Sequence, residues 1–350
     1  MSLSTQISSP FMHSNQTIRQ LMLRVQLAAI PALLVHIYLF GFGIMIQWLL
    51  AVATLLIVEY AMMKLRNRPA MPAIMDLSAL ITITALVFCI PPGAPWWIIV
   101  AGTSFALIFG KHLYGGLGYN PFNPAMLGYA FLLISFPVQM TQWTIPSEIS
   151  EHYISLVDAF SLIFSGSIPG IPFDMITSAT PLDELQTAIF QGVPVALTLD
   201  PTDPTHTSHT HYPLGLTSWQ WTNVAFVVGG LYLLVTRTIR WQYPVGFLAS
   251  LTTIAFIFHQ IDPNTYPPVD FVLLSGGTML AAFFIITDPV SSATTPKGRL
   301  IFAAGIGILV YVIRTWGAFP DGIAFAILLM NITVPLIDQY TQPRVYGHRS

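Results

Sequence analysis

Long apolar stretches follow one another along almost the whole sequence, and they decide what the chain can fold into. A helix that spans a membrane needs about 20 mostly apolar residues, and ten stretches approach that length. Inside a bilayer only helices and closed barrels satisfy their own backbone hydrogen bonds. We therefore expect an all-α integral membrane protein with about ten transmembrane helices. The expected spans lie near residues 21–41, 43–63, 75–89, 96–110, 122–136, 221–238, 243–259, 271–287, 299–313 and 322–336.

Composition supports a membrane protein and excludes several kinds of chemistry. Hydrophobic residues make up 54% of the chain and charged residues only 8%, whereas soluble domains carry about 25% charged residues. The single cysteine, Cys89, excludes an intramolecular disulfide and a thiolate-rich metal or iron–sulfur site within the chain. The sequence has no P-loop and no Rossmann glycine fingerprint. We expect no nucleic-acid partner, and any redox chemistry would need a borrowed cofactor.

The basic residues predict how the chain crosses the membrane. With the N-terminus in the cytoplasm, every Lys and Arg except Arg314 falls in a cytoplasmic segment, as the positive-inside rule requires. The long segment between Lys111 and Arg237 contains no basic residue, so we expect it to be external. The predicted layout is a cytoplasmic N-terminus (1–20), a five-helix half (21–137), an external segment (138–218), a second five-helix half (219–338) and a cytoplasmic C-terminus (339–350).

A weak internal repeat relates the two halves. Short matches recur 175 residues apart, and matches this few also arise by chance. If the repeat is real, five helices per half give two halves of opposite orientation, which usually frame a site at interrupted helices. The matching residues are Pro92, Gly102, Thr103 and Pro121 in the first half, and Pro267, Gly277, Thr278 and Pro296 in the second.

The external segment contains a clear helix start. Thr180 precedes Pro181, and Asp183 stands at the third helical position, which is typical of a threonine cap with proline at the first position. Free backbone N–H groups and a partial positive charge at such a start favour a bound phosphate. From local chemistry alone, Thr180 is either a cap or a phosphate-bearing residue.

The residues before this helix start resemble a known modification motif. Residues 174–183, Asp-Met-Ile-Thr-Ser-Ala-Thr-Pro-Leu-Asp, are similar to the flavin-attachment motif of two proteins: the D subunit of the Rnf electron-transport complex and the related B subunit of the sodium-pumping NADH:quinone oxidoreductase. The resemblance extends over almost all of the chain, including residues 115–126 and 287–292. It implies that a flavin transferase attaches FMN to Thr180 through a phosphoester bond. Asp174, Thr177, Ser178 and Ala179 match the rest of the motif.

This resemblance implies a function for the whole chain. We expect an electron-transfer subunit of an ion-translocating ferredoxin:NAD oxidoreductase in the bacterial inner membrane, without a complete active site of its own. Its expected partners are the other membrane, iron–sulfur and flavin subunits of the complex, and the lipid bilayer. Two alternatives stay open: a B-type subunit of the sodium-pumping reductase, whose family has a longer N-terminal region, and a flavin-free channel or transporter on the same repeat.

A second candidate site lies in the Gly- and Pro-rich segment 115–124. Asn120, Phe122 and Asn123 offer amides and a ring that can hold a flat heterocycle. In the family this segment lies at a second, non-covalent flavin site, for which riboflavin is the candidate ligand. The alternative is a proline-rich turn.

Other polar residues are weaker candidates. Glu59 and His36 lie inside expected spans, where ionisable residues are costly and usually functional, and Lys64 is a possible partner of Glu59. Residues 147–164 have the periodicity of an amphipathic helix that lies on the membrane, on a partner or within the loop. The histidines of the external segment are more typical of a solvated loop than of a metal site; they are His206, His209 and His211.

Overall fold

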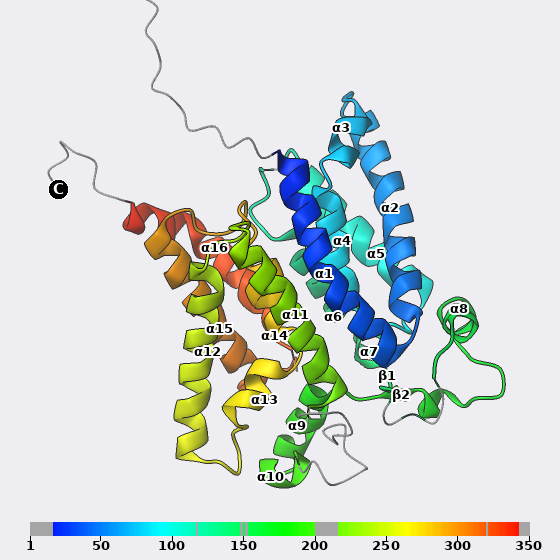
Figure 1. Ribbon diagram of the computed structural model, residues 1–350, viewed down its shortest axis with the longest axis vertical. Helices are drawn as coiled ribbons and strands as arrows, with labels where there is room; N and C mark the ends of the chain where they lie inside the picture. The colour runs from blue at the N-terminus through cyan, green and yellow to red at the C-terminus, as the bar shows by residue number, and fades with distance from the viewer. Residues whose placement is uncertain are drawn as a thin grey trace, which may run out of the picture.

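The computed structural model describes residues 17–116, 118–147, 150, 153–199, 216–319 and 321–342. These residues are mostly helical, and the helices form two groups that lie side by side (Figure 1). The first group contains α1 (Ile18–Phe40), α2 (Gly43–Leu65), α3 (Ala70–Met75), α4 (Ser78–Phe88), α5 (Trp96–Phe105), the π-helix η1 (Ala106–His112) and α6 (Pro124–Ser135).

The second group follows the long middle segment. It contains α11 (Ser218–Val235), α12 (Gln242–Ile261), α13 (Val269–Leu274), α14 (Thr278–Leu280), the π-helix η4 (Ala281–Ile285), α15 (Pro296–Trp316) and α16 (Ile323–Thr341). The middle segment holds short elements: α7 (Pro137–Thr141), β1 (Trp143–Thr144), α8 (Leu156–Ser165), the 3-10 helix η2 (Phe173–Met175), β2 (Thr177–Ser178), α9 (Pro181–Phe190) and α10 (Val195–Thr198).

Five of these helices are long and apolar enough to cross a membrane, and they are α1, α2, α12, α15 and α16. The chain is therefore a mostly helical membrane protein. The other expected spans are shorter or interrupted. The break between α13 and α14 is the clearest case, because Gly276 has a left-handed φ of +56° that no regular helix accepts.

Small residues let the two groups approach closely. At the contact between α1 and α11, a side chain on Gly229 would collide with the backbone oxygen of Ala28. Ala28, Ala29 and Ala32 are all buried there. Close backbone contact through Gly and Ala is the usual way in which membrane helices associate, because lipid provides no hydrophobic force between them.

The ends of the helical region lie on one side. In Figure 1 the start of α1 and the end of α16 lie toward the top, whereas α9 and α10 lie at the bottom. This arrangement agrees with two chain ends on one side of a membrane and the middle segment on the other. Which side faces the cytoplasm stays a prediction.

The interrupted helices coincide with the internal repeat. The π-helix η1 begins at Ala106 and η4 begins at Ala281, the same 175-residue spacing as the sequence matches. Each π-helix follows a short α-helix, so both halves depart from regular helix at equivalent points. The opposite orientation of the halves stays a prediction.

Candidate functional site

Thr180 caps the first turn of α9. Its Oγ1 accepts a hydrogen bond from the backbone N–H of Asp183 (3.2 Å) and donates one to Asp183 Oδ2 (2.6 Å). Pro181 occupies the first helical position. The predicted helix start is confirmed in each of these details, and the hydroxyl of Thr180 is held against a carboxylate.

The residues before Thr180 are fixed by a short antiparallel pair. In this pair Thr177 and Ser178 of β2 lie opposite Thr144 and Trp143 of β1. Thr177 also donates a hydrogen bond to the carbonyl of Phe173 (3.1 Å). The pairing ties the motif to the segment that follows α7.

Two hollows meet at the start of α9. Thr177, Ser178 and Ala179 line an open hollow of about 370 Å³ on the surface, and Asp183 contributes to it. Thr180 and Asp183 also line a cavity of about 210 Å³ that extends between the two helix groups. The exposed Asp174, in η2, lines neither hollow.

The inner cavity has aromatic walls and a polar edge. Its ring-bearing walls are His36, Phe88, Tyr129, Trp143, Trp219, Phe226 and Phe319. Asp321 and the glycines of the α13–α14 break line the same cavity as Thr180. The space is thus suited to a flat, largely apolar ring system with a few polar atoms.

Two buried side chains on this cavity have unsatisfied polar atoms. Both ring nitrogens of His36 and the indole nitrogen of Trp219 have no hydrogen-bond partner among the described residues. His36 is 3% exposed and Trp219 is 8% exposed. An unpaired buried donor or acceptor costs about 1–3 kcal/mol, so a ligand that reached these atoms and paired with them would be stabilised.

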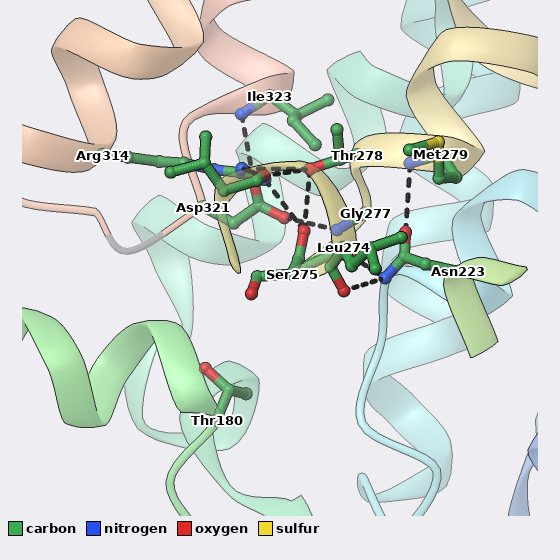
Figure 2. A network of polar contacts seen from close by, with 12 residues as sticks. Thr180, Asn223, Leu274, Ser275, Gly277, Thr278, Met279, Arg314, Asp321 and Ile323 are labelled. Carbon is green, nitrogen blue, oxygen red and sulfur yellow. Dashed lines mark hydrogen bonds and ion pairs between the residues drawn. The ribbon is translucent and has the colours of Figure 1, made fainter. Parts of the chain in front are cut away.

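An ion pair lies at the helix break that lines the cavity, as Figure 2 shows. Arg314 Nη2 donates to Asp321 Oδ1 (3.0 Å), and the backbone N–H of Gly277 donates to Asp321 Oδ2 (3.0 Å). Arg314 Nη1 donates to Thr278 Oγ1 (3.0 Å). Thr180 lies below this network in the same view. The guanidinium therefore holds the start of α14 and the carboxylate of Asp321 in fixed positions.

Asn223 on α11 forms hydrogen bonds with the backbone groups that the α13–α14 break leaves without helical partners. Its Nδ2 donates to the carbonyls of Leu274 and Gly276, both at 2.9 Å, and its Oδ1 accepts from the N–H of Met279 (3.1 Å). Unpaired carbonyls are costly in a membrane, so this amide makes the irregular segment tolerable there. Sequence reasoning missed Asn223, because its partners lie about fifty positions away along the chain.

In the second candidate site, at residues 115–124, Asn123 uses its hydrogen bonds to hold the protein together. Asn123 caps α6, where its Oδ1 accepts from the N–H groups of Ala125 (3.0 Å) and Met126 (3.2 Å). Its Nδ2 donates to Ile285 O (3.3 Å), and its backbone N–H donates to Asn331 Oδ1 (3.1 Å). Asn123 thus joins the two halves.

Asn120 makes a local contact in the same segment, since its Nδ2 donates to the carbonyl of Phe122 (3.0 Å). The hydrogen bonds that join the halves here are made by Asn123, and Phe122 is partly exposed. A flavin at this site is therefore better tested by changing Asn120 and Phe122.

We expect Asn123→Leu to destabilise the fold. The change removes a helix cap, worth about 1 kcal/mol, and leaves the buried carbonyl of Ile285 unpaired, at about 1–3 kcal/mol. Thermal unfolding should show a lower midpoint, while Asn120→Leu, which removes one local hydrogen bond to the Phe122 carbonyl, should lower the midpoint less. Equal midpoints for Asn123→Leu and the wild type would contradict the structural role.

The comparison with known proteins decides the family. The sequence profile described as the NQR2, RnfD, RnfE family matches residues 5–347. The chain belongs to this family. It is 49% identical to the D subunit of the ion-translocating oxidoreductase complex of Yersinia enterocolitica, over 98% of each chain. It is 47% identical to the protein of the same name from Vibrio atlanticus, over 97% of this chain and 98% of the relative.

In this member of the NQR2, RnfD, RnfE family, the structure describes some of the remaining polar candidates and leaves others outside the described residues. Glu59 is buried but pairs with Lys111 and His112 rather than with Lys64. Within the predicted amphipathic stretch, α8 covers Leu156–Ser165. The three candidate histidines lie outside the described residues; they are His206, His209 and His211.

Proposed function

We propose that the chain is the membrane-embedded D subunit of an Rnf-type ion-translocating ferredoxin:NAD oxidoreductase, and that it carries FMN esterified to Thr180 as an electron-transfer centre. One observation carries this proposal. Thr180, at a helix start, lines a cavity that is also lined by His36 and Trp219, two residues with unpaired polar atoms.

The residues present fit such a group. The open hollow beside Thr177, Ser178 and Ala179 offers room for a phosphate at the start of α9, where the helix favours negative charge. The inner cavity offers aromatic walls for the flavin ring, and His36 and Trp219 offer hydrogen bonds to its polar edges. Bound FMN would supply one- and two-electron chemistry, which the side chains of this chain lack.

Asp183 has a defined part in this site. Its carboxylate accepts the Thr180 hydroxyl proton in a 2.6 Å hydrogen bond, so it can take up that proton when the oxygen is esterified. Burial raises the pKa of Asp183, against the opposing effect of its hydrogen bonds with Thr180. A phosphate on Thr180 would bring further negative charge, so Asp183 must then turn away or stay protonated.

The surrounding protein orients and shields the ring. Arg314 and Asp321 fix the α13–α14 break, and the aromatic walls would leave little room for water beside a bound ring. Low polarity strengthens each hydrogen bond to the ring, so the wall residues are suited to set its potential. A non-covalent flavin near Asn120 and Phe122 would complete a path from one side of the protein to the other.

The wider proposal places the chain in the bacterial inner membrane with both termini in the cytoplasm and the flavin-bearing segment in the periplasm. Its partners would be the other membrane, iron–sulfur and flavin subunits, a flavin transferase during maturation, and lipid. The two halves would be inverted copies. The relatives match over nearly their full length, which supports a D-type rather than a longer B-type subunit.

Two tryptophans on α11 provide a test of the cavity. Trp219→Phe should leave the amount of covalent flavin unchanged but alter its fluorescence and shift its two-electron midpoint potential by roughly 20–30 mV, the equivalent of one hydrogen bond. Trp221→Phe is the matched control, because Trp221 does not line the cavity. His36→Leu should act as Trp219→Phe does. Flavin spectra and potentials unchanged in both cavity variants would contradict the placement of the ring, and a channel without flavin would show no signal at all.

A further inference from the structure

Helix α8, in the middle segment, has more apolar surface than the protein covers. Its inner face is buried and consists of Ala159, Leu162 and Ile163. A second apolar face is exposed; this outer face consists of Leu156, Val157, Phe160 and Phe164. Val157 is 77% exposed and Phe160 is 58% exposed. A contiguous exposed apolar face of this kind marks a surface that binds a membrane or another protein.

The sequence of α8 divides the helix into three sectors. An α-helix has 3.6 residues per turn, so the inner and outer faces lie next to each other around the axis. The third sector is polar and consists of Asp158, Ser161 and Ser165. Ser165 is exposed, and its hydroxyl donates to the carbonyl of Ser161 (2.6 Å). A helix at a membrane surface beside a protein needs these three sectors, which face protein, acyl chains and water.

The inner face of α8 packs on the end of a membrane-spanning helix. Ala159 and Ile163 form a buried cluster with Ile46 of α2, and Phe42 and Leu50 pack against it. These three partners lie at the start of α2 and within about its first two turns. In Figure 1 α8 lies beside the lower end of α2 and is seen nearly end-on, whereas α2 is seen from the side. The short helix therefore crosses the end of a span.

The part of α2 that carries α8 also exposes apolar side chains. Met45 and Leu49, which neighbour Ile46 and Leu50 in the sequence, are 43% and 52% exposed. Helix α2 is long and apolar enough to cross a membrane, so such side chains are expected to face lipid. The exposed apolar surface of α2 thus reaches the turns on which α8 rests. A lipid boundary accounts for the exposed apolar side chains of both helices.

The segment before α8 is tied to the same end of the first helix group. The backbone N–H of Ser147 donates to the carbonyl of Leu39 (2.7 Å), and the hydroxyl of Tyr153 donates to the carbonyl of Ile37 (3.1 Å). Gly41 allows close approach, because a side chain there would collide with the backbone oxygen of Ile154. These contacts hold α8 in place, so its outer face is ordered before it meets any ligand.

We propose that α8 is an interfacial membrane helix whose outer face is embedded among lipid acyl chains at the bilayer surface. The occupant is lipid, because the outer face adjoins the lipid-facing side of α2. Binding is apolar and does not select anionic headgroups, since no Lys or Arg lies between Lys111 and Arg237. The proposal does not depend on a flavin at Thr180, because no residue of α8 lines the Thr180 cavity.

The inner face connects this anchor to the residues before Thr180. Leu162 forms a buried cluster with Ile168 and Ile176. Ile176 directly precedes Thr177, the first residue of β2. Gly93 lets Leu162 approach the start of α5, because a side chain there would meet Leu162 Cδ2 at 2.7 Å. An anchored α8 therefore fixes the height of the β2 segment relative to the membrane surface.

Spin labels on the outer face test the proposal, and the single native cysteine makes labelling selective. In a Cys89→Ala background, nitroxide labels are placed by Val157→Cys or Phe160→Cys, and the chain is reconstituted in phosphatidylcholine vesicles. Power saturation then compares collisions with oxygen, which concentrates in acyl chains, and with a nickel chelate, which stays in water. The oxygen-to-nickel ratio at both positions should be close to that at Leu49→Cys and several times that at Ser165→Cys.

A double variant tests whether the outer face itself holds the helix in lipid. Phe160→Gln with Phe164→Gln removes its two rings, so the ratio at Val157→Cys should fall toward that of Ser165→Cys. The ratio at Leu49→Cys should not change, which shows that the fold is intact. Adding phosphatidylglycerol to the vesicles should leave every ratio unchanged, because α8 has no basic residue.

Three results would overturn the proposal. The first is a water-like ratio at Val157→Cys and Phe160→Cys in the reconstituted chain. The second is a ratio at Val157→Cys that stays lipid-like in the double variant. The third is a lipid-like ratio in the chain alone that is lost when the chain is purified together with its partner subunits, which would identify a protein as the occupant of the outer face.

Discussion

Thr180→Ala is expected to abolish covalently bound flavin. The hydroxyl of Thr180 is the atom to which the phosphate would be joined, and alanine offers no oxygen in its place. The loss of the cap costs about 1 kcal/mol, which a folded chain of this size tolerates. In-gel flavin fluorescence after denaturation is the measurement, with the chain produced in a host that contains the flavin transferase.

Three further variants separate attachment from capping. Thr180→Asn keeps a good cap but lacks the hydroxyl, so it should also lose the flavin. Thr180→Ser keeps both the cap and a hydroxyl and should retain at least part of the fluorescence. Thr177→Ala should retain it, because Thr177 is bonded to Phe173 and does not line the inner cavity. Fluorescence that persists in Thr180→Ala and Thr180→Asn would exclude Thr180 as the attachment residue.

Reporter fusions should place Thr207 and Arg240 on opposite sides of the membrane. Alkaline phosphatase fused after Thr207 should be active, because the segment that lacks basic residues is expected to be external. The same enzyme fused after Arg240, beyond α11, should be inactive, since α11 is expected to return the chain to the cytoplasm.

A cytoplasmic reporter at the same two positions serves as the control and should give the reverse activities. If phosphatase is inactive after Thr207 and active after Arg240, the orientation is wrong and Thr180 faces the cytoplasm. Such a result would leave the structure of the Thr180 site unchanged and would alter only the side from which the proposed flavin would exchange electrons.

Local features of the site were predictable from sequence. The start of α9 follows from Thr180, Pro181 and Asp183, whose interactions are confined to four consecutive residues. His36 was expected inside a span, and it lies in α1, where its side chain is buried. The resemblance to the family, which the comparisons confirm, also rests on contiguous stretches of sequence.

Features that depend on distant contacts were not predictable in this way. The partner of Glu59 was sought one helical turn away at Lys64, but it is Lys111, which lies 52 positions along the chain. From sequence alone Trp219 is an ordinary interfacial tryptophan. Only the folded structure shows that it lines the Thr180 cavity. Arg314 was recognised only as the exception to the charge pattern, and the fold shows that it pairs with Asp321.

The expected helix pattern was right in type and less accurate in length. Hydropathy locates apolar stretches, but it does not reveal that Gly276 breaks one of them or that α5 continues as a π-helix. The break at Gly276 needs Asn223, Arg314 and Asp321 to satisfy exposed backbone groups, and the three residues come from different parts of the chain. Only the folded arrangement shows that such partners are available.

The most direct test of the central proposal is the mass of the Thr180-containing peptide from the chain purified from its native host. We predict that this peptide carries one riboflavin phosphate joined through its phosphate, and that fragmentation assigns the added mass to Thr180. An unmodified Thr180 in an electron-transferring complex, or the flavin on another residue, would contradict the proposal.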